Sequence, residues 1–402
     1  MQLGKGENME ISLNMFLTTA IAVIVYYVGK FIKTKVFFLQ KYCIPAPVVG
    51  GIIFATATLV LHVTGILILT MDTTLQTAFM LVFFCSIGFN ARMKVLKKGG
   101  IQLVIIIFLV GILCVLQNVL GAAIVSAFGM NPLLGTAIGS VPLVGGHGTA
   151  AAFGVLIEQA GVASAATASY AAATYGLVAG CVIGGPLARI RIMQLNRKSV
   201  THEQEDEAFV NEKTHNILSG EKIMLAVALL LLCVGLGTII SDILNRLMTF
   251  SAAVGSLLAG CILRNVCDCK GIVLPDEEIE ITGDVSLSLF LSMAMMSMEL
   301  WLLASLAIPM IVTLLAETVL VGLFAYFIIF NSLGRDYDAA VMTAGTCGFG
   351  LGATPNAIAN MNAVTSVYGP ALRAFLIIPI VGSMFADLVN STVITLFMNV
   401  LG

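Results

Sequence analysis

Two glycine-rich segments, residues 131–157 and 336–361, hold the residue types best suited to binding chemistry. Each combines glycines with hydroxyl, amide or imidazole side chains inside an otherwise apolar stretch. Glycine lets a helix unwind and lets a ligand approach the main chain closely. The freed carbonyl groups can hold a desolvated cation, and the N-terminus of a half-helix can hold a carboxylate. The candidate binding residues are therefore Gly145, Gly146, His147, Gly148, Thr149, Gly348, Gly350, Gly352, Thr354 and Asn356.

Packing is the alternative interpretation of these glycines. Small residues permit tight contacts between helices, and this would explain a single glycine run equally well. It does not explain why two related runs interrupt the chain with glycine and proline between long apolar spans, so the pattern favours a site. His147 also has two interpretations, because it could bind substrate or titrate near neutral pH, or it could lock the loop as a neutral, hydrogen-bonded histidine.

Asp387 lies in an apolar stretch near the C-terminus, where a carboxylate costs about 2.5–3.5 kcal/mol unless it faces a polar cavity. In an α-helix over 371–400, Ser383, Asp387, Asn390 and Ser391 share one face. We expect this face to meet the glycine-rich segments and to hold Na⁺ near Asp387 and their backbone carbonyl groups. The alternative is a buried carboxylate satisfied by neighbours in its own helix.

Two further polar patterns lie inside apolar spans. Glu317 occupies the position at which the first half of the chain has Gln117. It could couple an ion to transport, or it could make a polar contact between helices. A helical stripe of polar residues in the fifth span is expected to line the same cavity from the other half; it comprises Ser164, Thr167, Tyr170 and Thr174.

The composition identifies the solvent in which these residues work. Of the 402 residues, 59% are hydrophobic and only 10% are charged, and the mean hydropathy is +1.02. Such a chain is an integral membrane protein. A net charge of −2 gives no nucleic-acid signal. The nine cysteines are scattered, mostly within apolar spans, and they predict neither disulfides nor a metal site. No cofactor is expected.

The apolar pattern predicts ten full transmembrane spans. We place them at residues 11–32, 48–71, 73–91, 101–128, 162–188, 223–243, 247–264, 284–302, 304–330 and 371–400. The two glycine-rich segments lie between the fourth and fifth spans and between the ninth and tenth. Each is too broken for one continuous helix, and we expect re-entrant hairpins.

Internal similarity divides the chain into two repeats. Gly145 and Thr149 recur 205 residues later as Gly350 and Thr354. Each half holds five crossings, an odd number, so the second copy must enter the membrane upside down. The predicted fold is an all-α integral membrane protein with two inverted repeats, 1–188 and 222–402, each of five transmembrane helices plus one re-entrant hairpin. The charged stretch 189–221 joins them as a cytoplasmic linker.

The residues quoted above, together with three further motifs, carry a resemblance. The motifs are Pro45-x-Pro47-Val-x-Gly50-Gly51, Val285-Ser-Leu-Ser-Leu-Phe290 and Tyr337-Asp-Ala-Ala340. The chain resembles the sodium/glutamate symporter family over nearly its whole length. The resemblance implies sodium-coupled uptake of L-glutamate across the bacterial inner membrane, with two hairpins lining the site. It also implies a homodimer in contact with membrane lipid, in which a mobile domain carries the site past a fixed one in an elevator motion.

Other functions remain open at this point. A transporter of citrate or another di- or tricarboxylate would share the same anion-binding physics. An ion channel would not need two gated hairpins. An intramembrane enzyme is disfavoured because the chain has no HExxH motif and no pair of membrane aspartates with catalytic spacing.

Topology gives the first testable prediction. The predicted spans place 18 of the 20 Lys and Arg residues in the cytoplasm if both termini are extracytoplasmic. A cysteine introduced at Glu205 should therefore resist a membrane-impermeant reagent in intact cells. Labelling at that position would contradict the inverted-repeat assignment.

Overall fold

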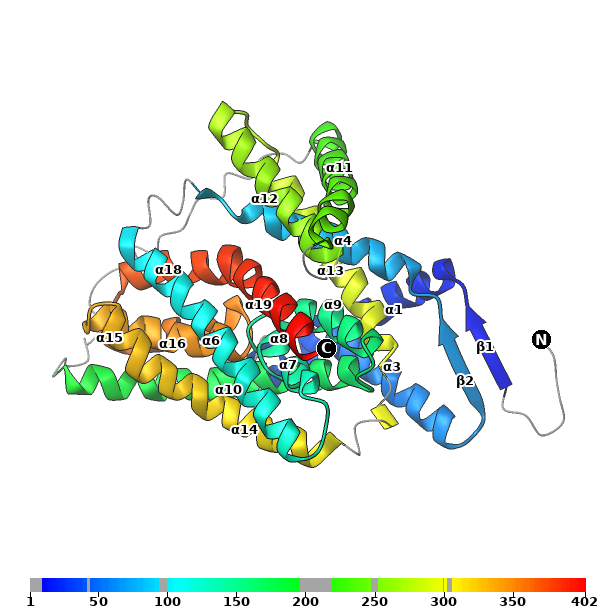
Figure 1. Ribbon diagram of the computed structural model, residues 1–402, viewed down its shortest axis with the longest axis horizontal. Coiled ribbons are helices and arrows are strands. Elements are labelled where there is room, and N and C mark those ends of the chain that lie inside the picture. Colours follow the sequence, from blue (N-terminus) through cyan, green and yellow to red (C-terminus); the bar gives the residue numbers. More distant parts are fainter. Residues whose placement is uncertain are drawn as a thin grey trace.

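Helices dominate the computed structural model, which describes residues 9–41, 44–93, 100–195, 219–246, 252–298, 300–301 and 306–402 (Figure 1). Within these ranges, nine helices are long and apolar enough to cross a membrane. The third expected span corresponds to the 17-residue helix α4 (Thr74–Asn90). The prediction of an integral membrane protein with many helical spans is therefore confirmed.

The helices of the first half follow the expected spans closely. They are α1 (Met15–Lys35), α2 (Phe37–Lys41), α3 (Ala46–Val63), α4, α6 (Gly100–Ala127), α7 (Leu133–Ile138), α8 (Ser140–Leu143), α9 (Gly146–Gln159) and α10 (Ala165–Gln194). Most of the expected linker, residues 196–218, lies outside the described ranges.

The second half contains two segments of π-helix. Its elements are α11 (Gly220–Leu244), α12 (Ala252–Lys270), α13 (Asp276–Met296), α14 (Ala307–Leu323), η2 (Phe324–Ile329), α15 (Phe330–Ser332), α16 (Tyr337–Leu351), α17 (Thr354–Tyr368), α18 (Leu372–Ile380), η3 (Val381–Phe385) and α19 (Ala386–Leu401). Helix α13 begins at Asp276, before the span expected at 284–302. Its first turn carries Asp276, Glu277 and Glu278, which suit a helix N-terminus although they lower the hydropathy.

The structure agrees with the predicted all-α membrane fold, and a short two-stranded sheet accompanies the helices. Strands β1 (Met9–Leu13) and β2 (Leu67–Met71) form a parallel pair in which Met9 pairs with Leu67 and Leu13 with Met71. The first and second expected spans, 11–32 and 48–71, therefore each have one end in a strand. Helix α3 ends near Gly65, whose φ of 67° is left-handed, and β2 that follows contains β-branched Ile68 and Thr70.

The connection from β2 to α4 is held by a local capping contact. The Asp72 carboxylate accepts hydrogen bonds from the Thr74 backbone N–H at 2.9 Å and from the Thr74 hydroxyl at 2.6 Å. These two hydrogen bonds lower the pKa of Asp72 below its ordinary value. The carboxylate thus satisfies a free N–H group at the start of α4.

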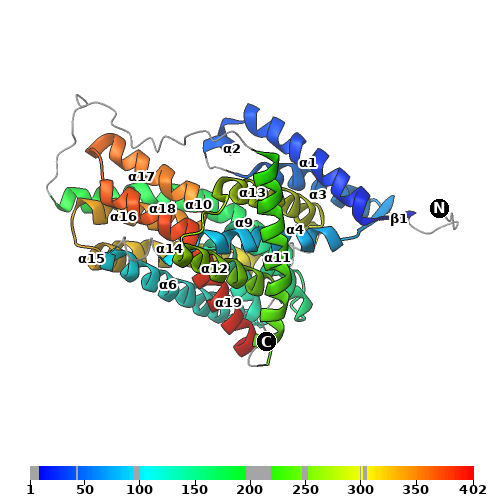
Figure 2. The same ribbon diagram turned by 90° about the horizontal axis from the view of Figure 1, so that it is seen from above.

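The helices assemble into two groups that each draw on both halves of the chain (Figure 2). The outer group contains α1, α3, α4, α11, α12 and α13. The hairpin group contains α6 to α10 and η2, η3 and α14 to α19. The more extensive contacts between the groups are made by α9 with α13, α4 with η3, and α12 with α19.

The two glycine-rich segments consist of short helices that pack on each other. In the first, Gly139 separates α7 from α8, and α8 packs on α9. In the second, Gly352 and Ala353 separate α16 from α17, which also pack together. A helix of 15 residues, the length of α16, is about 22 Å long and falls short of a hydrocarbon core of about 30 Å.

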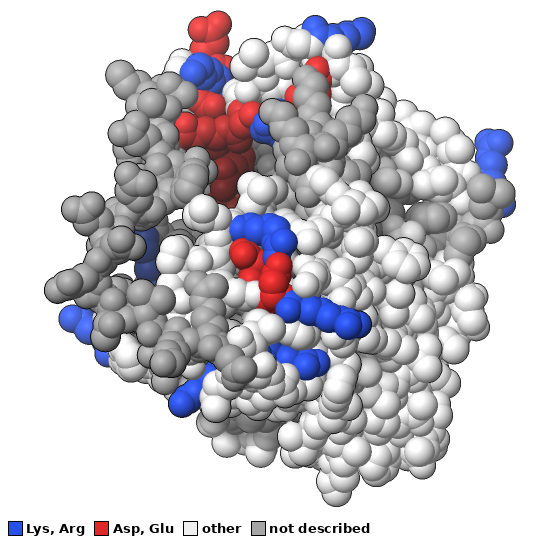
Figure 3. All heavy atoms as spheres, turned by 90° about the vertical axis from the view of Figure 1, so that its left-hand side faces the viewer, with Lys and Arg blue, Asp and Glu red and all other residues white. Residues whose placement is uncertain are grey.

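Charged side chains gather where α10 ends and α16 and α18 begin, on the face that Figure 3 shows. There Arg373 of α18 forms an ion pair with Asp336 at 2.5 Å. Asp336 also accepts a hydrogen bond from the Ala339 backbone N–H at the start of α16. Asp338 accepts one from the Ala374 N–H. These contacts fix the base of the second glycine-rich segment to α18.

Three glycines let α10 approach the second glycine-rich segment. A Cβ atom on Gly176 would overlap the Leu351 carbonyl oxygen, one on Gly180 would lie 2.9 Å from the Cys347 carbonyl oxygen, and one on Gly184 would overlap the Asn360 side chain. The spacing of four residues places them on one face of α10. A helix of the first half thus packs directly against a helix break in the second.

This contact predicts unequal effects of two substitutions on the same helix. Gly176→Ala should destabilise the protein by about 1–3 kcal/mol because the methyl group overpacks the interface. Gly185→Ala is the matched control, since a Cβ there meets no atom within 4 Å. The midpoint of thermal unfolding in detergent should fall for the first variant only; equal midpoints would show that α10 does not need the close approach.

Candidate functional site

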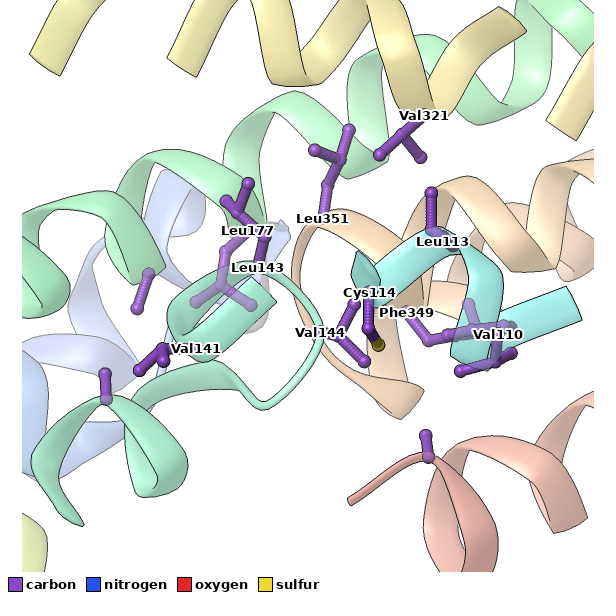
Figure 4. Close-up of a cluster of buried hydrophobic side chains, with 14 of the residues drawn as sticks. Val110, Leu113, Cys114, Val141, Leu143, Val144, Leu177, Val321, Phe349 and Leu351 are labelled. Atoms are coloured by element: carbon purple, nitrogen blue, oxygen red, sulfur yellow. The ribbon is translucent and has the colours of Figure 1, made fainter. Parts of the chain in front are cut away.

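The two glycine-rich segments meet at their breaks. Gly146, the first residue of α9, has a φ of 62°. A Cβ atom there would lie 3.2 Å from the carbonyl oxygen of Gly352, which follows α16. Figure 4 shows Leu143 and Val144 of the first segment close to Phe349 and Leu351 of the second. Gly146 and Gly352, about 205 positions apart in the sequence, thus lie side by side at the N-terminus of α9.

His147 links the first segment to α10. Its Nε2 lies 3.0 Å from the Thr174 hydroxyl oxygen, and the side chain is buried. The Thr174 hydroxyl donates to the Tyr170 carbonyl oxygen at 3.1 Å. With that hydrogen used, the Thr174 oxygen accepts from His147, which places the imidazole hydrogen on Nε2. This contact agrees with a histidine that locks the segment.

A cavity of about 330 Å³ lies on the seam between the two helix groups. One side is lined by Gln76 and Thr77 of α4 and by Thr73, which precedes that helix. Thr167 and Tyr170 of α10 line the other. The cavity volume is within the range of small-molecule sites, about 300–1,000 Å³. Two members of the polar stripe expected on the fifth span therefore line a cavity. The carbonyl oxygen of one of them, Tyr170, accepts a hydrogen bond from Thr174, which in turn bonds to His147.

Ser140, at the break between α7 and α8, is held by two buried amide side chains. Its backbone N–H donates to Asn118 Oδ1 of α6 at 3.0 Å. Its carbonyl oxygen accepts from Asn390 Nδ2 of α19 at 2.9 Å. Asn118, Ser140 and Asn390 are all fully buried. The helix break is thus stabilised by one helix from each half of the chain.

The face expected on the last span is only partly assembled. Asn390 reaches the first glycine-rich segment as described, and Ser391 beside it is buried. Asp387, one turn earlier, is partly exposed. Ser383 is exposed and its hydroxyl donates to the Pro379 carbonyl oxygen at 2.6 Å. Ser383 lies within the π-helical segment η3 and Asp387 follows it in α19, and the wider π-helical turn shifts the register that an α-helix would give.

Amide side chains also hold the second glycine-rich segment. Gln117 Nε2 of α6 donates to the Gly350 carbonyl oxygen at 3.0 Å. Asn356 Nδ2 donates to the Leu177 carbonyl oxygen of α10 at 2.8 Å, and Asn360 Nδ2 donates to that of Gly180 at 2.9 Å. Sequence reasoning selected Asn356 and Asn390 but not Gln117, Asn118, Ser140 or Asn360. Their signal is an uncharged polar side chain at membrane depth, where it needs a partner.

The remaining glycines of the two segments face their neighbours. A Cβ on Gly148 would lie 2.9 Å from the Phe83 ring of α4, one on Gly348 would overlap the Ala357 backbone, and one on Gly350 would lie 3.2 Å from Leu113. The packing interpretation therefore applies to these three positions. Gly145 lies beneath the Thr149 side chain.

Thr354 stands at the start of α17, against η3. A Cβ atom added to Gly382 of η3 would lie 2.6 Å from the Thr354 hydroxyl oxygen. This places the second glycine-rich segment in contact with the last span, as the first segment is through Asn390.

The hairpin group contains buried oxygens that lack a donor. Eight side-chain oxygens there have no hydrogen-bond partner in the described part of the chain: Gln117 Oε1, Thr136 Oγ1, Ser140 Oγ, both carboxylate oxygens of Glu317, Asn356 Oδ1, Asn390 Oδ1 and Ser391 Oγ. Such atoms are costly to bury unless a cation, a proton donor or water satisfies them. The described residues contain no group of three His, Cys, Asp or Glu side chains suited to a metal ion. The amide and hydroxyl oxygens among these eight instead suit a monovalent cation, which neutral oxygens can coordinate.

Comparison with known proteins gives a consistent result. The sodium/glutamate symporter family model matches residues 11–370. A sodium/glutamate symporter of Escherichia coli strain K12 is 40% identical over 394 residues, which cover 96% of this chain and 98% of the relative. A sodium/glutamate symporter of Haemophilus influenzae is 38% identical over 397 residues, covering 96% and 97%.

The meeting of the two segments predicts the effect of a substitution at Gly146. Gly146→Val should abolish the sodium-dependent glutamate uptake expected from the sequence, because its side chain would enter the contact with Gly352 and disfavour the left-handed backbone. Gly129→Val is the control, since Gly129 has a φ of 73° and no atom within 4 Å of a Cβ. If the two variants show equal uptake at equal expression, the contact between Gly146 and Gly352 is not needed for transport, and the effect of the substitution comes only from the left-handed backbone that both glycines share.

Proposed function

This chain belongs to the sodium/glutamate symporter family, and we propose that it imports L-glutamate with sodium across the bacterial inner membrane. The observation that carries the proposal is the similarity to curated sodium/glutamate symporters over 96% of the chain. The family is one of transporters and not of enzymes. Both termini are extracytoplasmic in this proposal, as the distribution of Lys and Arg in the sequence favours.

Residues 1–188 and 222–402 form two inverted repeats joined by the cytoplasmic linker 189–221. Residues 131–157 and 336–361 enter the membrane from opposite faces as re-entrant hairpins. Two features support this arrangement. Both segments are built from helices too short to cross the bilayer, and their breaks lie together at Gly146 and Gly352.

Glutamate binds where the two hairpins meet. Its two carboxylates suit the two half-helix N-termini that start at Gly146 and Thr354, because each start leaves backbone N–H groups without a helical acceptor. Hydrogen bonds connect the cavity on the seam to this point, because Tyr170, which lines the cavity, accepts from Thr174, and Thr174 bonds to His147 beside Gly146. Uptake competition between glutamate and citrate tests the selectivity, and preference for citrate would favour the alternative substrate class.

One sodium ion binds beside the first hairpin, near Asp387. Three oxygens there lack partners in the described part of the chain, those of the Ser140 hydroxyl, the Asn390 side chain and the Ser391 hydroxyl. Asp387 lies on the same helix, three residues before Asn390. A carboxylate with neutral oxygens around it gives a cation both charge and coordination.

Uptake that the membrane potential assists needs more than one sodium ion per glutamate. Glutamate carries one net negative charge, and a negative-inside potential opposes its entry by roughly 2.3 kcal/mol per 100 mV. One sodium ion cancels this term, whereas two or more let the potential assist uptake. We therefore expect at least two.

Alternating access occurs by an elevator motion of the hairpin group against the outer group, within a homodimer that the family resemblance implies. The division of helices supports this motion. Each group is closely packed internally, and the larger contacts between groups are confined to three pairs of elements. In addition, Phe83 and Phe84 of α4 lie against Gly148 and Phe153 of α9, an apolar contact that can slide without breaking ion pairs.

Sodium coupling gives the corresponding prediction. Asp387→Asn should raise the sodium concentration for half-maximal uptake by roughly tenfold or more, because it removes a formal charge from the cation site. The glutamate concentration for half-maximal uptake should change less. Asp242→Asn is the control for loss of one carboxylate, since Asp242 is exposed on α11 of the outer group.

The measurement is glutamate-driven current and radiolabelled uptake in proteoliposomes over a range of sodium concentrations. Wild-type protein should carry net positive charge inward with glutamate. Electroneutral transport would contradict the stoichiometry, and unchanged sodium dependence of Asp387→Asn would remove Asp387 from the site.

A further inference from the structure

Glu317 of α14 is a fully buried carboxyl group with no assigned partner. It is 0% exposed, and neither of its oxygens has a hydrogen-bond partner in the described part of the chain. Burying an ionised carboxylate in this way is far more costly than burying the neutral acid. A helix contact alone leaves that cost unexplained, because the described residues offer these oxygens no hydrogen-bond donor.

Helix packing places Glu317 at the same depth as Gln117. A Cβ on Gly350 would lie 3.2 Å from Leu113 of α6 and 3.3 Å from Val321 of α14, so these helices approach the second hairpin at one level. The two helices pack together and run in opposite directions (Figure 1). One turn after Leu113 is Gln117, and one turn before Val321 is Glu317. Because the helices are antiparallel, one turn forward on α6 and one turn back on α14 go in the same direction, so Gln117 and Glu317 lie at one level.

The two side chains are complementary only if Glu317 carries a hydrogen. Gln117 uses its Nε2 to donate to the Gly350 carbonyl oxygen, and its Oε1 has no partner in the described residues. A protonated Glu317 can donate to that oxygen. An ionised Glu317 would repel the oxygen and attract the Nε2 group away from Gly350.

Among the described residues, no cationic side chain lies beside Glu317 in place of the proton. Of the elements with larger contacts to α14, helices α6 and α7 and segment η2 contain no Asp, Glu, Lys, Arg or His. The Arg189 and Arg191 side chains of α10 lie near its C-terminal end, and Arg191 stacks on Tyr326 at 3.6 Å. Asp338 of α16 is in its first turn. Tyr175 of α10 reaches the residue next to Glu317, because its hydroxyl bonds to Thr318 at 2.9 Å.

We propose that Glu317 binds a proton and donates it as a hydrogen bond to Gln117, so that Gln117 holds the Gly350 carbonyl of the second hairpin. Loss of this proton turns the Gln117 amide toward Glu317 and frees the hairpin. This inference rests on the proposed transport function, which neutral-pH uptake by the wild type tests separately.

Glu317→Gln is the informative variant, because glutamine mimics the protonated acid in size and can donate to Gln117. Initial uptake should be measured at saturating sodium, with equal pH on both sides of the proteoliposome membrane. Wild-type uptake should fall at alkaline pH, approaching a tenfold loss per pH unit as a single group loses its proton. Uptake by Glu317→Gln should change by less than about twofold beyond the change caused by titration of the substrate amine. Glu221→Gln, at the exposed start of α11, should follow the wild type. The substrate amine titrates in the same range and affects all three proteins equally.

Two outcomes would overturn the proposal. The first is an alkaline fall in Glu317→Gln identical to that of the wild type. The second is a lower ratio of sodium to glutamate in this variant, which would make Glu317 a cation ligand.

Hydrogen exchange in the wild type provides a test if Glu317→Gln does not fold. After correction for intrinsic rates, the amides of α16 should lose protection at alkaline pH while those of α9 do not. Equal behaviour of the two helices would also refute the proposal.

Discussion

Every break in a membrane helix leaves backbone N–H and carbonyl groups that water cannot satisfy, and this requirement organises the hairpin group. The protein meets it with amide side chains from intact neighbouring helices. Asn118 and Asn390 hold Ser140 in the first glycine-rich segment, and Gln117 and Asn360 bond to carbonyl oxygens around the second. An amide can donate and accept at once, without carrying a charge into the membrane. The irregular backbone that a binding site needs is therefore affordable only where these helices surround it.

The same requirement explains why the helix groups do not follow the two halves of the chain. Helix α6 contacts the second hairpin segment through Gln117, and α19 contacts the first through Asn390. Helix α10 packs on α16 through its glycines. Each half supplies the helices that complete the other, so the hairpin group is a single body, while α1, α3, α4 and α11 to α13 pack beside it.

The sequence was informative about elements and less informative about contacts. Hydropathy located the spans because the apolar runs match the bilayer thickness, and glycine and proline located the two breaks. It missed β1 and β2, because Leu67–Met71 is as apolar as the helix before it. It missed the displacement of Ser383, because a π-helical turn such as η3 has no strong sequence signal. The partners of Asn118 and Gln117 depend on residues far along the chain, and a single sequence contains no information about such pairs.

The contact between Asn390 and Ser140 also bears on how the protein is made. These residues are 250 positions apart, so the first glycine-rich segment is synthesised long before the helix whose Asn390 side chain donates a hydrogen bond to its Ser140 carbonyl oxygen. During elongation, the Ser140 carbonyl must remain hydrated, or be covered by the insertion machinery or a temporary neighbour, until α19 emerges from the ribosome. The hairpin group can therefore close only at the end of biogenesis, and a nascent chain that stops short of α19 would present an unfinished polar break to the lipid and become a target for membrane quality control.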